Sequence, residues 1–401
     1  MNHNKNAGFV TRKLALTAAI SLAVAGCGGG GGGGGGSSSD DGSGGGATAQ
    51  SGQFKDSNVQ GLTYTIDGES SLTAADGSFE YASGDSITFS IGNVELGTVS
   101  GDEIITMVQL IQDGATDQDA VINRARLLQY LDANQDTSDG ISIPEALRDA
   151  AADWTITDFS DNAAFDTDIA AIQGDVEAAI SGATLPSSAD ARTHIEDTQR
   201  CVRAGAYRGS YSGSDSGPFG LLVSAKTGDA TGVAMSEVSD DPFSLSATQS
   251  VALDSEGAFV SGSASSGASF SGKFDSVNAL SGRWENDSTA DSGSFSGQRI
   301  GGDADAKFRF TGRFSGADGG LFAFDVDGSG NVTGVAYSIN EDELYDISGN
   351  VDGSVLTAAY GGNAGSINGT LDLDSGDLSG SWENSSDGSS GTFSGDGCAL
   401  N

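Results

Sequence analysis

The fold of this chain is decided by a stretch that occurs twice, Ser281-Gly-Arg-Trp-Glu-Asn-Asp-Ser-Thr-Ala-Asp-Ser-Gly-Ser-Phe-Ser-Gly297 and Ser379-Gly-Ser-Trp-Glu-Asn-Ser-Ser-Asp-Gly-Ser-Ser-Gly-Thr-Phe-Ser-Gly395. Upstream of it, residues 209–213 match 312–316 and residues 231–234 match 333–336. With the Trp-Glu-Asn and Phe-Ser-Gly blocks of the quoted stretch, four blocks recur in the same order, which indicates an internal duplication. We therefore predict two β repeats, over residues 204–302 and 303–401.

Each copy holds about eight short segments in which apolar and polar residues alternate, with turn residues roughly every 8 to 12 positions. Such a pattern is typical of closed antiparallel barrels and of sandwiches, which leave few strand edges exposed. It fits two tandem eight-stranded units, and it also fits one sixteen-stranded sheet system. Strand glycines opposite aromatic residues predict that Trp284 and Trp382 lie over glycine backbone. The outward positions are Ser, Gly, Thr and Asp, which argues against a barrel that spans a membrane.

Two compositional zones precede the duplication. Over residues 51–101, short apolar alternations are separated by turn pairs such as Asp67-Gly68, which predicts a small antiparallel β domain. Over residues 102–203 glycine becomes sparse, which predicts a helical domain whose first helix has one apolar face, formed by Val121, Ile122, Ala125, Leu128 and Leu131. Further helices are expected over 144–152, 166–181 and 188–201. The predicted fold class is therefore mainly β with a helical insert (α+β).

The charge of the chain limits its partners. Its 401 residues include 56 Asp plus Glu against 18 Lys plus Arg, a formal net charge of −38. This excess argues against a nucleic-acid partner, because binding phosphate groups requires a basic surface. The two histidines are His3 and His194, which excludes zinc sites built on several imidazoles. We expect His194 to be a surface residue of a charged helix, so no serine-protease triad is predicted.

The N-terminus has the features of an export signal. Residues 1–13 are basic and carry no acid, and residues 14–25 form an apolar run that is too short for an ordinary membrane anchor. The run ends in Val24-Ala25-Gly26-Cys27, which resembles the lipobox of bacterial lipoproteins. This resemblance implies a signal peptide over residues 1–26 and a diacylglycerol on the Cys27 thiol. Because Gly28 follows and not Asp, it also implies anchoring at the outer membrane, on its periplasmic or cell-surface face.

A Gly/Ser-rich segment follows the lipobox. Residues 27–50 contain little that can be buried, and they predict a flexible tether. The wider pattern of lipobox, tether, acidic helical zone and Gly/Ser-rich β repeats resembles lipoproteins of marine gammaproteobacteria, which implies a class and no particular activity. The eight-segment copies are also loosely similar to the C-terminal barrels of surface lipoproteins that work beside an outer-membrane transporter.

One loop between expected helices has the spacing of a cation site. It contains alternating oxygen ligands, a turn glycine and a closing glutamate, and its candidate ligands are Asp132, Asn134, Asp136, Asp139 and Glu145. Oxygen ligands in this pattern suit Ca²⁺, and the segment resembles an EF-hand loop. It departs from that loop because Gly140 comes three positions late and Glu145 is fourteenth instead of twelfth. We predict a calcium site here, and the alternative is a solvated acidic connection between helices.

Two cysteines remain once Cys27 is lipidated. They are Cys201, just before the first β copy, and Cys398, at the end of the second. An exported chain meets an oxidising compartment, so we predict a disulfide between them.

Three functions from different classes agree with these patterns. The first is a non-enzymatic binding, adhesion or structural role at the cell envelope, with calcium as a stabilising ion and a polysaccharide, an apolar small molecule or a protein as ligand. The second is ligand capture beside an outer-membrane transporter, which an apolar barrel lumen would favour. The third is a carboxylate-dependent hydrolase, for which Glu285 and Glu383 are the acids to examine. The sequence has no recognisable catalytic constellation, so we expect no enzymatic activity.

Overall fold

The computed structural model describes residues 49–239, 241–250, 252–301, 306–341, 343–373 and 375–400. The predicted signal peptide over 1–26, the lipidation site Cys27 and nearly all of the tether therefore lie outside the described residues.

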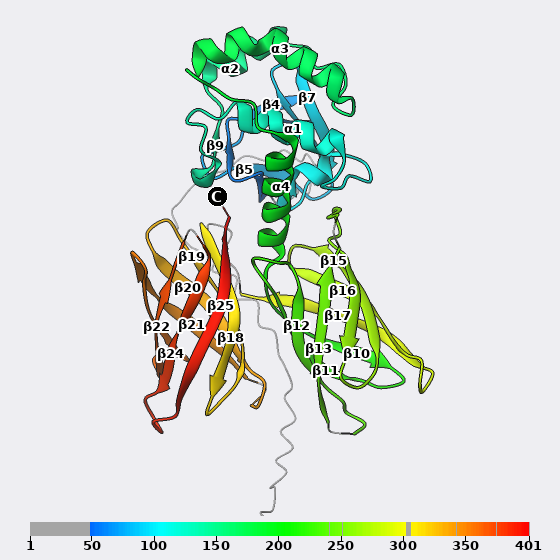
Figure 1. The fold of residues 1–401 in the computed structure, drawn as a ribbon, viewed down its shortest axis with the longest axis vertical. Helices are drawn as coiled ribbons and strands as arrows, with labels where there is room; N and C mark the ends of the chain where they lie inside the picture. Colours follow the sequence, from blue (N-terminus) through cyan, green and yellow to red (C-terminus); the bar gives the residue numbers. More distant parts are fainter. Residues whose placement is uncertain are drawn as a thin grey trace, which may run out of the picture. The chain divides into compact units, whose positions relative to one another are not determined.

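The duplicated part forms two closed eight-stranded antiparallel barrels in tandem (Figure 1). Barrel 1 consists of β10 (Gly205–Gly213), β11 (Gly217–Val223), β12 (Ala230–Met235), β13 (Pro242–Gln249), β14 (Phe259–Ala264), β15 (Ser269–Ser276), β16 (Ala279–Asn286) and β17 (Asp291–Ile300). Barrel 2 consists of β18 (Phe308–Gly316), β19 (Gly320–Val326), β20 (Asn331–Ser338), β21 (Glu343–Asp352), β22 (Val355–Tyr360), β23 (Gly365–Leu371), β24 (Asp377–Asn384) and β25 (Ser390–Ala399). The predicted tandem barrels are confirmed, and the alternative of one sixteen-stranded sheet is wrong.

Each barrel is closed by two of the blocks that recur in the sequence. Residues 209–213 of β10 pair antiparallel with residues 293–297 of β17, and residues 312–316 of β18 pair with 391–395 of β25. The glycine partners across the two seams are Gly209–Gly297 and Gly213–Gly293 in barrel 1, and Gly312–Gly395 and Gly316–Gly391 in barrel 2. A Cβ added to Gly209 would lie 2.6 Å from the Cα of Gly297 and 2.1 Å from the Ser296 carbonyl oxygen. The seam strands therefore approach too closely for any side chain at this position.

The repeated tryptophans lie over glycine, as the sequence predicts. Trp382 on β24 is the register partner of Gly391 on β25, and a Cβ added to Gly391 would lie 2.6 Å from the indole Nε1. That Nε1 donates a hydrogen bond to the Ser315 carbonyl at 3.2 Å, across the seam on β18. In barrel 1, Trp284 Nε1 donates to the Ser212 carbonyl at the same distance. Each indole therefore bridges three neighbouring strands around the closure.

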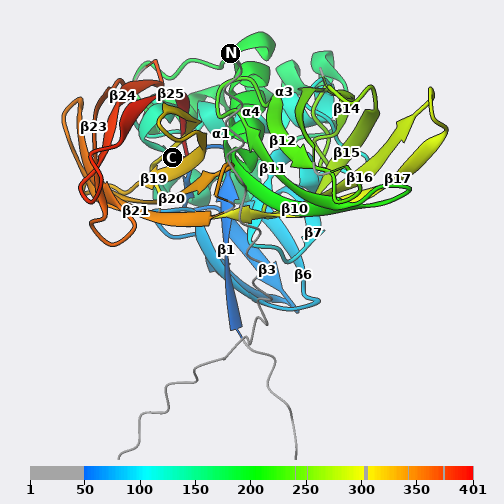
Figure 2. The same cartoon turned by 90° about the horizontal axis from the view of Figure 1, so that it is seen from below.

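The chain before the barrels contains the predicted antiparallel β unit, blue to cyan in Figure 2. A four-stranded antiparallel sheet has the order β4 (Glu69–Leu72), β3 (Thr63–Ile66), β6 (Ser86–Ile91) and β7 (Val94–Ser100). Beside it, β1 (Ala49–Lys55) pairs antiparallel with β5 (Ser78–Ala82) and parallel with β8 (Ile104–Thr106). A second parallel pair joins β2 (Val59–Gln60) to β9 (Ile141–Ser142), which comes from the helical segment.

Four α-helices follow: α1 (Asp119–Tyr130), α2 (Glu145–Ala150), α3 (Asn162–Ala179) and α4 (Ser188–Arg203), with short 3₁₀ turns η1 (Met107–Leu110), η2 (Thr137–Asp139) and η3 (Ala151–Asp153). The predicted apolar face of α1 is buried. Helix α3 begins four residues before its expected start because the Asp161 carboxylate accepts the backbone N–H groups of Ala163 and Ala164. One hydrophobic core, which runs from Phe54 to Ile195, joins these helices to the sheets. The β and helical zones expected over 51–101 and 102–203 therefore share a common core.

The C-terminal end of α4 is bound to barrel 2 by a buried ion pair. Arg309 Nε and Nη2 donate to Asp325 at 2.8 and 3.0 Å, and Nη1 donates to the carbonyls of Cys201 and Val202 at 3.5 and 3.3 Å. The guanidinium thus donates to carbonyl groups of the last helical turn. One of them, that of Cys201, also accepts from the Ala204 N–H at 3.2 Å.

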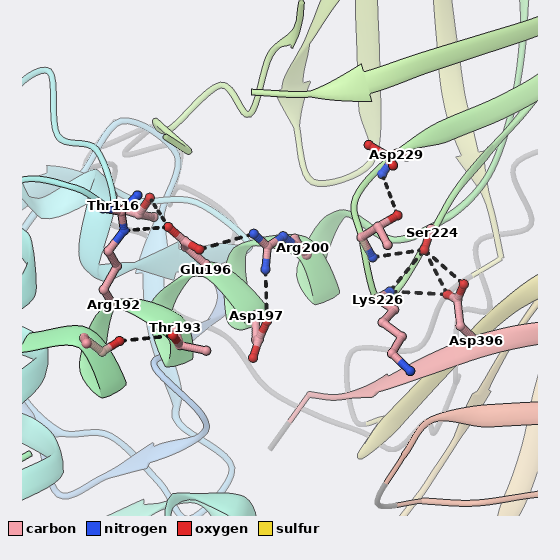
Figure 3. A network of polar contacts seen from close by, with 12 residues as sticks. Thr116, Arg192, Thr193, Glu196, Asp197, Arg200, Ser224, Lys226, Asp229 and Asp396 are labelled. Carbon is pink, nitrogen blue, oxygen red and sulfur yellow. Dashed lines mark hydrogen bonds and ion pairs between the residues drawn. The ribbon is translucent and has the colours of Figure 1, made fainter. Parts of the chain in front are cut away.

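Further polar contacts lie within α4 and between the two barrels (Figure 3). Glu196 on α4 accepts from Arg192 Nε at 2.8 Å and from Arg200 Nη2 at 3.3 Å. Ser224, after β11, donates to the Asp396 carboxylate of β25.

Cys201 and Cys398 form the predicted disulfide, with a sequence separation of 197. Replacing both with Ser is expected to lower the free energy of unfolding by about 2–5 kcal/mol, because the bond closes a long loop in the unfolded chain. Urea unfolding of the exported protein measures this difference, and the reduced wild-type protein is the control that should match the variant. A thiol titration that finds both sulfhydryls free in the native protein would contradict the pairing.

Candidate ligand-binding cavities in the two barrels

Barrel 2 is hollow at one end of its lumen. A cavity of about 230 Å³ is lined there by residues that include members of the turns β18–β19, β20–β21, β22–β23 and β24–β25. In an up-and-down barrel these four turns lie at the same end, so the cavity opens at that end. The hydrophobic cluster of this barrel, which includes Phe310, Val326 and Leu378, fills the rest of the lumen.

Aromatic rings form much of the cavity wall. Trp382 meets Phe314 edge to face, with 6.1 Å between ring centroids and an interplanar angle of 84°, and it meets Tyr360 at 6.4 Å and 81°. Tyr360 in turn meets Tyr345 at 5.9 Å and 79°. Edge-to-face contacts are a favourable geometry for aromatic pairs. The rings therefore support one another around the space.

Barrel 1 has a smaller cavity at the corresponding end, of about 140 Å³. The duplication places Tyr211, Phe219, Trp284 and Phe295 in its wall, where barrel 2 has Phe314, Phe322, Trp382 and Phe393. Phe219 and Phe295 meet edge to face at 5.9 Å, as their counterparts in barrel 2 do at 5.7 Å. Both copies of the repeat thus hold the same ring arrangement at the same end.

Each cavity has an aspartate in the first turn of its barrel. Asp318 Oδ1 accepts hydrogen bonds from the Gly319 N–H at 2.7 Å, the Ser338 hydroxyl at 3.1 Å and the Asn340 side-chain amide at 2.8 Å. In barrel 1, Asp215 Oδ1 accepts from the Ser216 N–H at 2.7 Å and from the Ser236 hydroxyl at 3.1 Å. A turn N–H and a serine on the next hairpin therefore hold a carboxylate at the mouth in both copies.

In barrel 1 a tyrosine hydroxyl also donates to the aspartate at the mouth. Tyr211 Oη donates to Asp215 Oδ2 at 3.1 Å. Burial raises the pKa of Tyr211, and the hydrogen bond to the carboxylate raises it further. The hydroxyl therefore stays protonated and remains a donor to Asp215.

The acids named for a hydrolase do not reach either cavity. Glu285 and Glu383 are exposed, and each directly follows a Trp whose ring lines the lumen. Because successive side chains in a strand point to opposite faces, both glutamates lie on the outside of their barrels.

The predicted calcium loop is closed by hydrogen bonds among its own residues. Buried Asp132 accepts from the Ser142 N–H through Oδ1 and from the Asp136 N–H through Oδ2, both at 2.9 Å. Asn134 Nδ2 donates to both oxygens of Asp139, at 3.1 and 3.0 Å. Burial raises the pKa of Asp132, whereas the hydrogen bond from the Ser138 hydroxyl lowers the pKa of Asp136.

The last candidate ligand, Glu145, is exposed at the start of α2. Within the described ranges, no three Asp, Glu, His or Cys side chains gather closely enough to hold a metal ion. The calcium site therefore stays a prediction from the sequence.

His194 lies in a partly buried polar cluster, and with 23% of its side chain exposed it is less of a surface residue than predicted. Its Nε2 lies 3.2 Å from Ser57 Oγ and 3.7 Å from Oδ1 of the buried Asp56, whose pKa is raised by burial. Both neighbours face the same ring nitrogen, whereas a triad places its serine and aspartate on opposite nitrogens. The Ser57 hydroxyl donates to the Thr137 carbonyl at 2.7 Å. This cluster therefore connects the end of β1 to α4 and offers no activated nucleophile.

Sequence reasoning missed most of the cavity residues. The repeated blocks pointed to the Trp and Phe positions of both walls, but they gave no sign of Asp318, Glu341 or Tyr360. Asp318 and Asp215 hold matching positions in the two copies, and aligning the turns of the repeat as well as its strands would have found them.

Comparison with known proteins adds little to this geometry. No family model matches the chain, and no curated protein matches it. Among solved structures it is similar to a protein of unknown function of the DUF3598 family from Nostoc punctiforme, at 8% sequence identity. That match covers 51% of this chain and 98% of the other, and its TM-score of 0.13 carries no argument about function. No helix within the described residues is long and apolar enough to cross a membrane.

Proposed function

We propose that this chain is a non-enzymatic, lipid-anchored binding protein of the bacterial outer membrane, and that each barrel takes a small apolar molecule, or the apolar end of a larger one, into its lumen. The observation that carries the proposal is the ring-lined cavity at the same end of both copies. Ligand sites are typically concave, mostly apolar and supplied with a few polar groups, and barrel mouths are one of their usual places.

The sizes of the cavities limit what can enter. An apolar cavity of about 150 Å³ is large enough to bind benzene in a well-studied engineered protein. The cavity of barrel 1, at about 140 Å³, therefore suits a single ring or a short chain, and that of barrel 2, at about 230 Å³, suits a ring with substituents. Larger ligands would leave part of their structure outside the mouth. Capture of such a ligand for an outer-membrane transporter is the role that this geometry favours over adhesion.

A neutral fluorescent probe tests the apolar sites. N-phenyl-1-naphthylamine is expected to bind saturably, with a rise in fluorescence as it leaves water. Replacing Ala234 and Ala358 with Leu fills both lumens, because these buried alanines line the two cavities, and should weaken binding by about tenfold or more. Thr357→Leu is the matched control, since this exposed neighbour of Ala358 points outward and should leave binding unchanged. Equal binding by the filled variant and the wild-type protein would contradict the proposal.

The membrane anchor is proposed from residues 1–28 alone. Cys27→Ser is expected to release the protein from the membrane fraction, because the chain then loses its acyl chains. Gly28→Asp is the matched control: it keeps the lipid and should move the protein toward the inner membrane. Mass spectrometry of the N-terminal peptide checks the modification directly. An unmodified N-terminus in the wild-type protein, or a cytosolic location, would rule out the anchor.

We also propose that Ca²⁺ binds the loop from Asp132 to Glu145, on the strength of the ligand spacing. Some carboxylates of the loop accept hydrogen bonds from its own N–H groups. They would have to turn toward the ion for Ca²⁺ to bind. Calorimetry at millimolar Ca²⁺ should therefore record binding heat, and Asp136→Asn with Asp139→Asn should abolish it because two charged ligands are lost. Asp327→Asn, in an exposed hairpin turn of barrel 2, is the control. The absence of binding heat in the wild-type protein would leave the loop as a solvated connection.

A further inference from the structure

The mouths of the two cavities differ in charge. The side chains that line the barrel 2 cavity include three carboxylates, Asp318, Glu341 and Asp387, and no Lys, Arg or His is among the described residues that line it. The barrel 1 cavity is lined by two, Asp215 and Asp291. The three carboxylates of barrel 2 come from three different hairpin turns, β18–β19, β20–β21 and β24–β25. They are therefore distributed around the opening and do not form a single acidic run in the sequence.

A substitution between the copies removes the tyrosine donor from the aspartate at this mouth, where Asn340 donates instead. In barrel 1 the hydroxyl of Tyr211 donates to Asp215 and so shields part of its charge. Phe314 occupies the matching place in barrel 2, and it has no hydroxyl to offer Asp318. The donors that Asp318 does have converge on Oδ1 and come from Gly319, Ser338 and Asn340, which are all neutral. The negative charge of Asp318 is therefore held in place without being compensated by a cationic side chain among these contacts.

The negative charges of these carboxylates act on the tyrosines of the aromatic wall. Burial raises the pKa of Tyr360, and the charges of Asp387, Asp318 and Glu341 raise it further. Tyr345, which meets the Tyr360 ring edge to face, donates its hydroxyl to Glu341 and, at 3.1 Å, to Glu343. A positive charge near these rings would be stabilised both by the carboxylates and by the negative faces of the aromatic rings.

We propose that the barrel 2 cavity selects an apolar organic cation, whose ring or short chain fills the lumen and whose ammonium group lies at the mouth among Asp318, Glu341 and Asp387. This inference rests on the proposed uptake of apolar ligands by the barrels. It adds that the ligand of barrel 2 carries a positive charge. A neutral molecule would gain only the apolar contacts. An anion would be repelled by all three carboxylates, and it would find no basic side chain in the described lining.

Calorimetry with three compounds of similar size tests this selectivity: benzyltrimethylammonium as the cation, benzyl alcohol as the neutral ligand and phenylacetate as the anion. The mature protein carries Ala234→Leu in these experiments, so that the barrel 1 cavity is filled and does not contribute. We expect the cation to bind at least about tenfold more tightly than the anion, with the alcohol between them. Raising the salt concentration to about 0.5 M should lower the affinity for the cation and leave the affinity for the alcohol unchanged.

Variants at the mouth assign the effect to residues. Asp318→Asn with Glu341→Gln should lower the affinity for the cation about tenfold and change that for benzyl alcohol by less than about twofold. Glu285→Gln with Glu383→Gln is the control: it removes two exposed carboxylates on the outside of the barrels and should leave the affinity for both compounds unchanged. Glu341→Gln alone should lower the affinity for the cation by a smaller factor. Because Glu341 is exposed, this variant tests the proposal even if the double variant fails to fold.

The outcomes separate the two proposals. Equal binding of cation and alcohol, or a double variant that binds the cation as tightly as the protein with Ala234→Leu alone, would overturn the charge selectivity and leave apolar uptake standing. An equal loss of cation affinity in Glu285→Gln with Glu383→Gln would also overturn the assignment to the mouth of barrel 2. If none of the three compounds binds and the neutral probe does not bind either, both the selectivity and the proposed function are wrong.

Discussion

The structure depends on the close approach of the first and last strands of each barrel. Two glycine pairs in each seam bring the strands nearer than any side chain would allow. Because an open sheet would leave exposed edges on both of these strands, closure also removes a route to aggregation. The tryptophan of each copy then covers a seam glycine and hydrogen bonds to the strand beyond it. Two of the four repeated blocks therefore form each seam and a third, with the tryptophan, covers it.

Closure of the barrel also leaves room for a ligand inside it. The interior of an eight-stranded barrel is just wide enough to be filled by side chains or to hold one small ligand. At one end of barrel 2, Phe310 and Val326 fill it. At the other end the seam has glycine at Gly316 and Gly391 beside Phe314 and Phe393. There the rings of Phe314, Tyr360 and Trp382 meet edge to face around a space of about 230 Å³. The cavity is therefore a consequence of where the repeat places small and large residues along the same strands.

The duplication permits the two copies to diverge at their mouths while the barrel is kept. The seam glycines and the Trp–glycine contacts are the same in both, since changing them would open the barrel. The change from Tyr211 to Phe314 keeps an aromatic ring in the wall and removes the tyrosine hydroxyl from the aspartate at the mouth, where Asn340 donates instead. In a chain of net charge −38, the general field already attracts cations. The mouth of barrel 2 adds local carboxylates to that field beside an aromatic wall.

The sequence by itself determined the duplication, the eight strands of each copy, the placement of Trp over Gly and the pairing of Cys201 with Cys398. These follow from alternation, turn residues and the chemistry of single residues, which act over short stretches of chain. Only the tertiary structure decided that there are two barrels and not one large sheet, that residues 51–203 share one core, and that His194 faces Asp56. It alone also brought Asp318, Glu341 and Asp387 to one mouth and sent Glu285 and Glu383 outside. These features arise when residues from distant turns meet in space, and no local pattern records which turns will meet.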